Sequence, residues 1–103
     1  MNTESLWKQF KAICQIPHPS GHVAALREYI LGEVARAGLS ADVDDAGNVL
    51  VDVPATQGWS EKCRLQSRSA DDVTVLQAHI DMVPQANKDK EFDFLSDAIQ
   101  LRR

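Results

Sequence analysis

The chain has 103 residues, enough for one domain, and its 44% hydrophobic and 25% charged residues are typical of a globular protein rather than a disordered one. Its net charge of −4, from 11 basic and 15 acidic residues, argues against a nucleic-acid binder, because such proteins usually gather a basic excess on one face. No apolar run approaches the roughly 18 residues of a membrane span, and the N-terminus lacks the basic and apolar regions of a signal peptide. We therefore expect a cytoplasmic protein that binds neither nucleic acid nor membrane.

Two amphipathic helices are predicted in the first part of the chain. Apolar residues at three- and four-residue spacing indicate a helix over about residues 4–16, with Cys14 packed on its apolar face. The sequence IPHPSG ends this helix, because proline lacks a backbone donor. Ser20 is placed to cap a second helix, and Gly38 is a natural stop after its apolar stripe. Gly32 within that stripe predicts close packing, since glycine weakens a helix.

Beyond the second helix the hydrophobic pattern changes to that of strands. The sequence SADVDDAGNVLVDVP predicts a β-hairpin with its turn at Asp44 to Asn48, where Gly47 is free to adopt a positive φ. The alternating valines that follow predict a partly buried second strand, which Pro54 ends.

A long polar stretch over residues 55–72 predicts a surface loop, with an extra strand end near Arg64–Gln66. Cys63 lies in this stretch and is expected to be an exposed thiol. Neither Cys63 nor Cys14 has the partner spacing of a zinc site, and both are expected to stay reduced in the cytosol. The apolar residues of segment 73–83 are almost continuous, which predicts a central strand covered on both faces.

The predicted order is helix, helix, strand, strand, loop, strand and tail, which indicates an α/β fold with a sheet of at least three strands. A strand that is apolar on both faces needs neighbours on both edges, and few candidates remain in 103 residues. We therefore expect the chain to be the front of something longer.

The sequence VLQAHIDMVPQ, residues 75–85, places a histidine and an aspartate at the end of the predicted central strand. Residues two apart on a strand point to the same side, so His79 and Asp81 share a side. Ligands of open α/β sheets bind at this end of the strands. A neutral imidazole is a good zinc ligand, and a neighbouring carboxylate can orient its ring. The pair is consistent with the first fragment of a metal site, and also with two polar groups that only satisfy each other.

Several segments in order along the chain resemble the aminoacyl-histidine dipeptidases. These are the bacterial Xaa-His dipeptidases, or peptidase D, within the larger clan of co-catalytic metallopeptidases that includes the carnosinases. VLQAHIDMVPQ is similar to the first metal-site segment of this family. Four other segments are similar to its opening helix and turn, its second helix, its hairpin and the stretch after the metal motif: LWKQFKAICQIPHPSGH, LREYI, DDAGNVLVDVPAT and FDFLSDAIQLR. The resemblance covers nearly the whole chain apart from the polar insert around residues 60–72, which is longer than in the family.

The resemblance implies that residues 1–103 are the N-terminal portion of a metallopeptidase catalytic domain, incomplete here. This partial domain would have two N-terminal helices, a β-hairpin and a central strand in a mixed sheet. His79 would be a ligand of one of two divalent metal ions, zinc foremost, with manganese or cobalt as alternatives. Asp81 would be the catalytic aspartate that holds the His79 imidazole. The implied reaction is hydrolysis of unblocked dipeptides of the Xaa-His type, in which the metal pair lowers the pKa of a bound water and polarises the substrate carbonyl.

The chain departs from the family in the ligands that it lacks. The family's bridging aspartate, its paired glutamates and its later aspartate and histidine have no counterpart here, whereas a catalytic zinc usually has three protein ligands. His18 lies in a turn between two prolines and His22 opens a helix, so we expect structural or substrate-facing places for them and not a metal site. The acidic residues near the end of the chain match no ligand position and are expected to form a solvated surface: Asp89, Glu91, Asp93 and Asp97.

Three functions stay open from the sequence. The first is a segment of a metallodipeptidase, inactive without the missing ligands and acting on a dipeptide once they are supplied. The second is a non-catalytic α/β module that associates with another chain through an open sheet edge, and a homodimer is left open. The third is a mononuclear metal-binding protein that uses His79, Asp81 and carboxylates of the tail.

Overall fold

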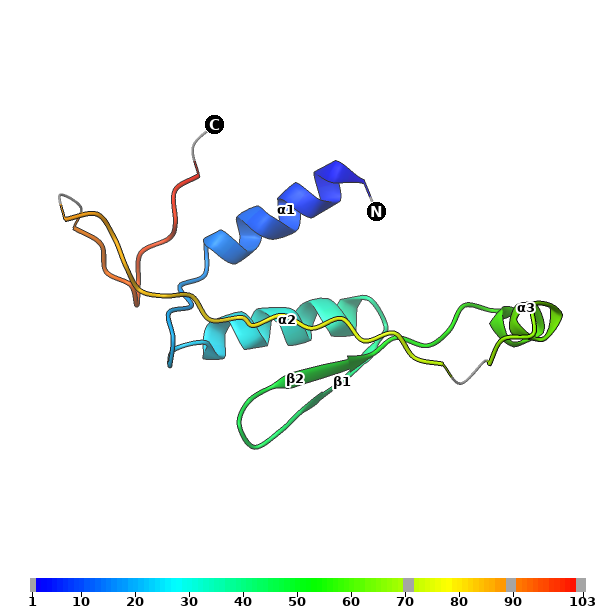
Figure 1. Ribbon diagram of the computed structural model, residues 1–103. Coiled ribbons are helices and arrows are strands. Elements are labelled where there is room, and N and C mark those ends of the chain that lie inside the picture. Colours follow the sequence, from blue (N-terminus) through cyan, green and yellow to red (C-terminus); the bar gives the residue numbers. More distant parts are fainter. Residues whose placement is uncertain (1, 70–71, 89–90, 102–103) are drawn as a thin grey trace.

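The computed structural model describes residues 2–69, 72–88 and 91–101. Figure 1 shows two helices, a two-stranded hairpin and a third helix in chain order: α1 (Thr3–Cys14), α2 (Ala24–Arg36), β1 (Ser40–Val43), β2 (Val49–Asp52) and α3 (Trp59–Leu65). The α/β class is therefore confirmed, with one more helix and fewer strands than predicted. None of the helices in these ranges has the length and apolar character that crossing a membrane requires.

The first helix, α1, closely matches the prediction for residues 4–16. Asn2 caps it, because its side-chain oxygen accepts a hydrogen bond from the backbone N–H of Ser5 at 2.8 Å. The predicted burial of Cys14 is confirmed, with 5% of its surface exposed. A side-chain contact holds α1 to α2, since the Tyr29 hydroxyl donates to Oε1 of Gln9 at 2.6 Å.

The second helix, α2, ends as predicted but does not begin as predicted. Its N-cap is Val23, whose side chain cannot accept a hydrogen bond, so the expectation that Ser20 caps this helix is wrong. Ser20 lies three residues earlier, and its hydroxyl bonds to a distant segment instead. At the other end Gly38 has a φ of +75°, and the N–H of Leu39 donates to the carbonyl of Val34 at 3.0 Å. This pattern is the helix ending that glycine favours.

The hairpin forms as predicted, with β1 and β2 paired antiparallel. The N–H of Asp44 donates to the carbonyl of Asn48 at 3.0 Å, and the Asp44 carboxylate accepts from the Asn48 backbone N–H and side-chain amide at 2.8 and 2.9 Å. Gly47 has a φ of +87°. Its carbonyl accepts a hydrogen bond from Nε of Arg27 in α2 at 2.8 Å. The turn is therefore held both by bonds within it and by a bond to α2.

The polar stretch 55–72 is not a plain loop, and the strand end expected at Arg64–Gln66 is absent from the described residues. Helix α3 occupies its middle instead, beginning after Gly58, whose φ is +84°. The N–H of Arg68 then donates to the carbonyl of Cys63 at 2.8 Å, which turns the chain back over the helix end. Cys63 is 1% exposed, so its expected exposure is wrong as well. The polar neighbours of Cys63 did not predict its exposure, because the short helix α3 buries this one side chain and leaves its polar residues on the surface.

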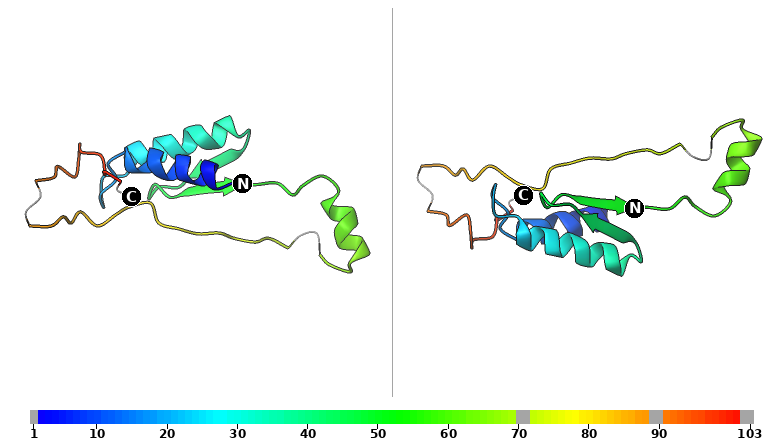
Figure 2. Two further views of the ribbon diagram at one scale, coloured as in Figure 1. Left: turned by 90° about the horizontal axis from the view of Figure 1, so that it is seen from above. Right: turned by 90° about the horizontal axis from the view of Figure 1, so that it is seen from below.

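Segment 73–83 is extended but is not a covered central strand, so this prediction is wrong for the structure as described. Among the described residues its backbone pairs through a single parallel bridge between Pro19 and Met82, and Leu76 is 92% exposed. The physical reason is the absence of neighbours. In the described ranges β1 and β2 pair only with each other, and Figure 2 shows the segment running apart from the hairpin toward the projecting α3.

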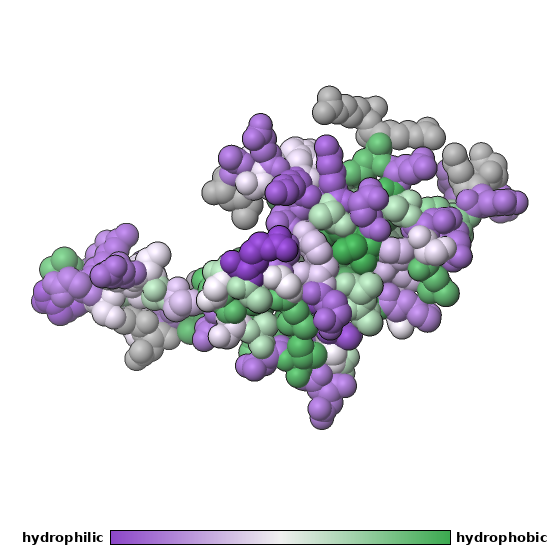
Figure 3. All heavy atoms as spheres, turned by 180° about the vertical axis from the view of Figure 1, so that it is seen from behind, coloured by the Kyte–Doolittle hydropathy of each residue, from purple (hydrophilic) through white to green (hydrophobic). Residues whose placement is uncertain are grey.

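The chain is expanded, with a radius of gyration of 18.1 Å and extents of 61 × 36 × 23 Å, where a compact domain of this length has a radius near about 13 Å. Among the described residues the buried hydrophobic side chains are Cys14, Leu26 and Cys63, whereas Trp7 and Phe10 of α1 stay exposed. Figure 3 shows apolar patches on the body and a mostly hydrophilic projection. Much apolar surface is thus left without cover.

Gly47 is expected to reject a side chain. A Cβ there would lie 2.5 Å from Nη2 of Arg27, and its backbone is left-handed. Gly47→Ala is therefore expected to lower the free energy of unfolding by at least about 1–2 kcal/mol, the usual cost of that conformation. Urea unfolding followed by circular dichroism measures the change.

Gly32→Ala is the matched control. The expectation of close packing at Gly32 is wrong, because no heavy atom of the described chain outside the local helix lies within 4 Å of a Cβ built there. Alanine should therefore stabilise α2 by up to about 1 kcal/mol. A loss of stability in both variants, or in neither, would contradict this account of the two glycines.

Candidate functional site

The segment that carries His79 and Asp81 is held against the turn between α1 and α2 by two backbone hydrogen bonds. The N–H of Met82 donates to the carbonyl of His18 at 3.0 Å, and the N–H of Ser20 donates to the carbonyl of Met82 at 3.0 Å. These bonds form the parallel bridge described above. The bridge fixes where the two candidate site residues lie relative to the first helices.

His79 and Asp81 are in contact. Nδ1 of His79 lies 2.9 Å from Oδ1 of Asp81 and 2.8 Å from the Asp81 carbonyl oxygen. Both of these oxygens accept hydrogen bonds, so Nδ1 must carry the proton and donate it. Nε2 of His79 is then left with its lone pair available. The His79 side chain is 81% exposed and that of Asp81 44%, so a ligand can reach them.

Ser20 is a third member of the site, although the sequence predicted it to be a helix cap. Its hydroxyl donates to Oδ2 of Asp81 at 2.6 Å, with a longer alternative at 3.3 Å to the carbonyl of Met82. The Ser20 hydroxyl first, and then His79, hold the pKa of the Asp81 carboxyl below its ordinary value. Asp81 is therefore a carboxylate at neutral pH. The turn sequence IPHPS belongs to the resemblance, but nothing local to Ser20 indicates a partner 61 residues away.

A cavity of about 830 Å³ lies beside the pair. The start of α2, the hairpin turn and residues 77–81 line it, and they include His22 and Arg27. His22 is thus placed at the cavity, in keeping with one of the two places left open for it. His18 takes the other, structural place, because it is 8% exposed and its Nδ1 donates to the carbonyl of Ile16 at 2.7 Å.

The residues present fit one corner of a metal site and no more. In the part of the chain that the structure describes, no three side chains of histidine, cysteine, aspartate or glutamate gather closely enough to hold a metal ion. His79 offers one ligand atom, Nε2. Both carboxylate oxygens of Asp81 already accept hydrogen bonds, which suits an orienting role better than a ligand role.

The tail carboxylates that the structure describes do not gather with His79. Oδ2 of Asp97 accepts the N–H of Asp93 at 2.8 Å, and Asp93 in turn accepts from Ser96. These bonds close a local turn. The Ser96 hydroxyl first, and then the N–H of Leu95, lower the pKa of the Asp93 carboxyl. Asp93, Asp97 and Glu91 are exposed, as predicted. Asp89 lies outside the described residues. The mononuclear site built with tail carboxylates therefore gains no support.

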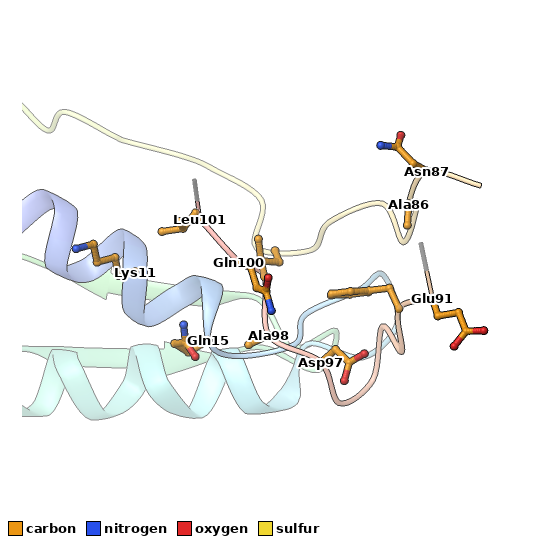
Figure 4. A pocket seen from close by; sticks show the side chains of 11 residues that line it. Lys11, Gln15, Ala86, Asn87, Glu91, Asp97, Ala98, Gln100 and Leu101 are labelled. Carbon is orange, nitrogen blue, oxygen red and sulfur yellow. The ribbon is translucent and has the colours of Figure 1, made fainter. Parts of the chain in front are cut away.

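A larger cavity of about 1100 Å³ lies between the end of α1 and the tail. Figure 4 shows its lining side chains around an open space, with Lys11 contributed by α1 and Gln15 lying directly after that helix. The N–H of Ile99 donates to the carbonyl of Cys14 at 2.9 Å and attaches the tail there. The described lining residues include two carboxylates, Glu91 and Asp97, but neither histidine nor cysteine, and no group of three potential metal ligands gathers among the described residues.

The chain is similar to known dipeptidases over almost its whole length. It is 43% identical over 100 residues to the cytosol non-specific dipeptidase of Escherichia coli strain K12, which covers 97% of this chain and 19% of that protein. It also matches the crystal structure of aminoacylhistidine dipeptidase from Vibrio alginolyticus with a TM-score of 0.79 and 43% identity, again over 97% of this chain and 19% of that one. No family model matches the chain. The resemblance in the sequence is thus confirmed, and the chain spans about a fifth of the length of these relatives.

Acid is expected to break the hydrogen bonds of Asp81 only below the ordinary pKa of an aspartate, about 4. Its pKa is depressed in the folded chain. The stability that it contributes is therefore fully present above the unfolded-state pKa and is lost as the pH falls through the folded-state pKa. NMR titration of the Asp81 carboxyl carbon should give a lower midpoint in the folded chain than in the same chain unfolded in urea. A midpoint that is equal or higher in the folded chain would contradict the geometry.

Proposed function

We propose that this chain supplies the first metal ligand, and the carboxylate that orients it, to the active site of a metal-dependent dipeptidase. The observation that carries the proposal is the contact between His79 and Asp81, which leaves Nε2 of an exposed imidazole free beside a cavity. The relatives are named as a non-specific dipeptidase and an aminoacylhistidine dipeptidase. Unblocked dipeptides, including those that end in histidine, are therefore the proposed substrates.

Each of the two residues has a separate proposed role. Nε2 of His79 holds one of two divalent ions, zinc foremost, with manganese or cobalt as alternatives. The Asp81 carboxylate accepts the Nδ1 proton, which fixes the tautomer and raises the basicity of the ring. When bound, the metal pair supplies Lewis-acid chemistry and a water of lowered pKa. We propose that the cavity between α2, the hairpin turn and residues 77–81 receives part of the substrate.

The remaining ligands are proposed to come from residues other than those that the structure describes. A catalytic zinc usually has three protein ligands, and His79 is the one offered by the described residues. We therefore propose that residues 1–103 are part of one metallopeptidase catalytic domain that other residues of a longer protein, or of a partner chain, complete. The Escherichia coli relative is named as a cytosol enzyme, which supports a cytoplasmic location for this chain.

A second candidate function is a non-catalytic module that associates with another chain. The observation that favours it is the unpaired extended segment before His79, in which Val73, Val75 and Leu76 are all exposed. Such an edge can pair with a strand of another chain, including a second copy of this one. Association through this edge would survive a chelator, whereas assembly that depends on metal would not.

A dipeptidase assay distinguishes the two functions. This chain with added zinc is expected to hydrolyse no Xaa-His dipeptide, whereas a longer protein that also supplies the other metal ligands should do so. In the completed protein His79→Ala should lower kcat/KM at least about 100-fold, because metal catalysis contributes several kcal/mol and each 1.4 kcal/mol is tenfold. Asp81→Asn should cost about 10- to 100-fold, as for other residues that orient a metal ligand.

Asp52→Asn is the control for the carboxylate, because Asp52 is an exposed residue of β2 away from the cavity lining. It should keep the parent kcat/KM. If no completed form were active with zinc, manganese or cobalt, the enzyme proposal would be overturned, and chelator-resistant association would then support the module.

A further inference from the structure

Three side chains form a continuous series of hydrogen bonds from the turn between α1 and α2 to the exposed imidazole. The Ser20 hydroxyl donates to one carboxylate oxygen of Asp81 at 2.6 Å, and His79 donates to the other at 2.9 Å. We propose that Ser20 is a positioning residue that holds the Asp81 carboxylate and, through it, fixes the tautomer and orientation of the His79 ring.

Burial does not explain these contacts. Ser20 is exposed and the side chains of His79 and Asp81 are 81% and 44% exposed, so water could satisfy each group without a protein partner. The bonds instead join residues 61 positions apart in the sequence. Because water could replace this long-range contact, we infer that it serves the arrangement of the site and not the stability of the core.

The two oxygens of Asp81 have different partners, and this controls rotation of the carboxylate. With Oδ2 held by Ser20, Oδ1 stays directed at Nδ1 of His79. A carboxylate bonded on one side only would rotate more freely and would align less well with the ring. The backbone carbonyl of Asp81 also accepts from Nδ1, at 2.8 Å, so loss of the aligned carboxylate should shift the proton only in part toward Nε2, the atom that the proposed function assigns to a metal ion. The consequence for metal binding therefore rests on that proposed function, but the tautomer does not.

The backbone bridge allows the hydroxyl to be removed separately. The bonds between Met82 and the backbone of His18 and Ser20 involve no side-chain atom. Ser20→Ala should therefore keep the segment in place while it releases one carboxylate oxygen. Ser20→Thr keeps the hydroxyl and should restore the parent behaviour.

Nitrogen-15 NMR of the His79 ring in this chain, at neutral pH and without metal, tests the inference. The parent and Ser20→Thr should show mainly the tautomer protonated at Nδ1. In Ser20→Ala the share protonated at Nε2 should rise roughly two- to tenfold, the effect of one hydrogen bond. The Met82 amide signal reports whether the bridge is intact. If Ser20→Ala loses the bridge, Ser20→Cys keeps the size with a weak donor and carries the same expectation.

An unchanged tautomer in a variant with an intact bridge would overturn the inference, and so would a threonine variant that behaves like alanine.

A double-mutant cycle separates positioning from a general structural effect. Zinc is titrated into the chain and followed at His79 Nε2. Ser20→Ala should weaken binding roughly two- to tenfold in the parent and have no effect beside Asp81→Ala. Equal effects in both backgrounds would also overturn the inference.

The two proposals can fail separately. A tautomer that responds to Ser20→Ala, in a chain whose His79 does not bind zinc, would support the positioning role and refute the metal role of this residue. Zinc binding at His79 that ignores Ser20→Ala would refute the positioning role and leave the metal role standing.

Discussion

The position of the candidate site depends on the backbone bridge between Met82 and the turn that follows α1. Segment 73–83 has no strand beside it in the described ranges, so ordinary sheet pairing does not hold it. Two hydrogen bonds of 3.0 Å, to the carbonyl of His18 and from the N–H of Ser20, do so instead. They bring together residues about sixty positions apart, and the Ser20 hydroxyl adds a side-chain bond to Asp81 across the same sequence separation.

The bridge also attaches the polar site to the turn between α1 and α2. His18 is buried and its ring is bonded to the carbonyl of Ile16, so the turn itself is well fixed. The hydroxyl of Ser20 extends from that turn to Asp81, and Asp81 extends to His79. An exposed imidazole thereby acquires a defined tautomer without being buried. This arrangement explains how a chain with a small core can still present an imidazole with an oriented Nε2.

The sequence predicted what local patterns determine. Helical spacing located α1 and α2, a glycine of positive φ marked the hairpin turn, and the period of two placed His79 and Asp81 on one side. It failed where distant contacts decide. Ser20 was interpreted as a helix cap because its partner lies 61 residues away. Cys63 was expected to be exposed because its neighbours are polar, and the strand before His79 was expected to be covered because its residues are apolar. The burial of Cys63 and of the segment before His79 depends on which other parts of the chain pack against them, and local sequence patterns do not encode that packing.

Helix α3 stands on two extended stems, away from the body of the chain (Figure 2). The chain leaves β2 before α3, and residues 72–81 return to the bridge, so the two ends of this insert are set by other elements than α3. Lengthening such a connecting segment lowers the stability of the fold only slightly, since each doubling of a flexible loop costs only about 0.6 kcal/mol. Insertions, deletions and sequence drift can therefore accumulate at α3 over evolutionary time while the imidazole beyond it keeps its place.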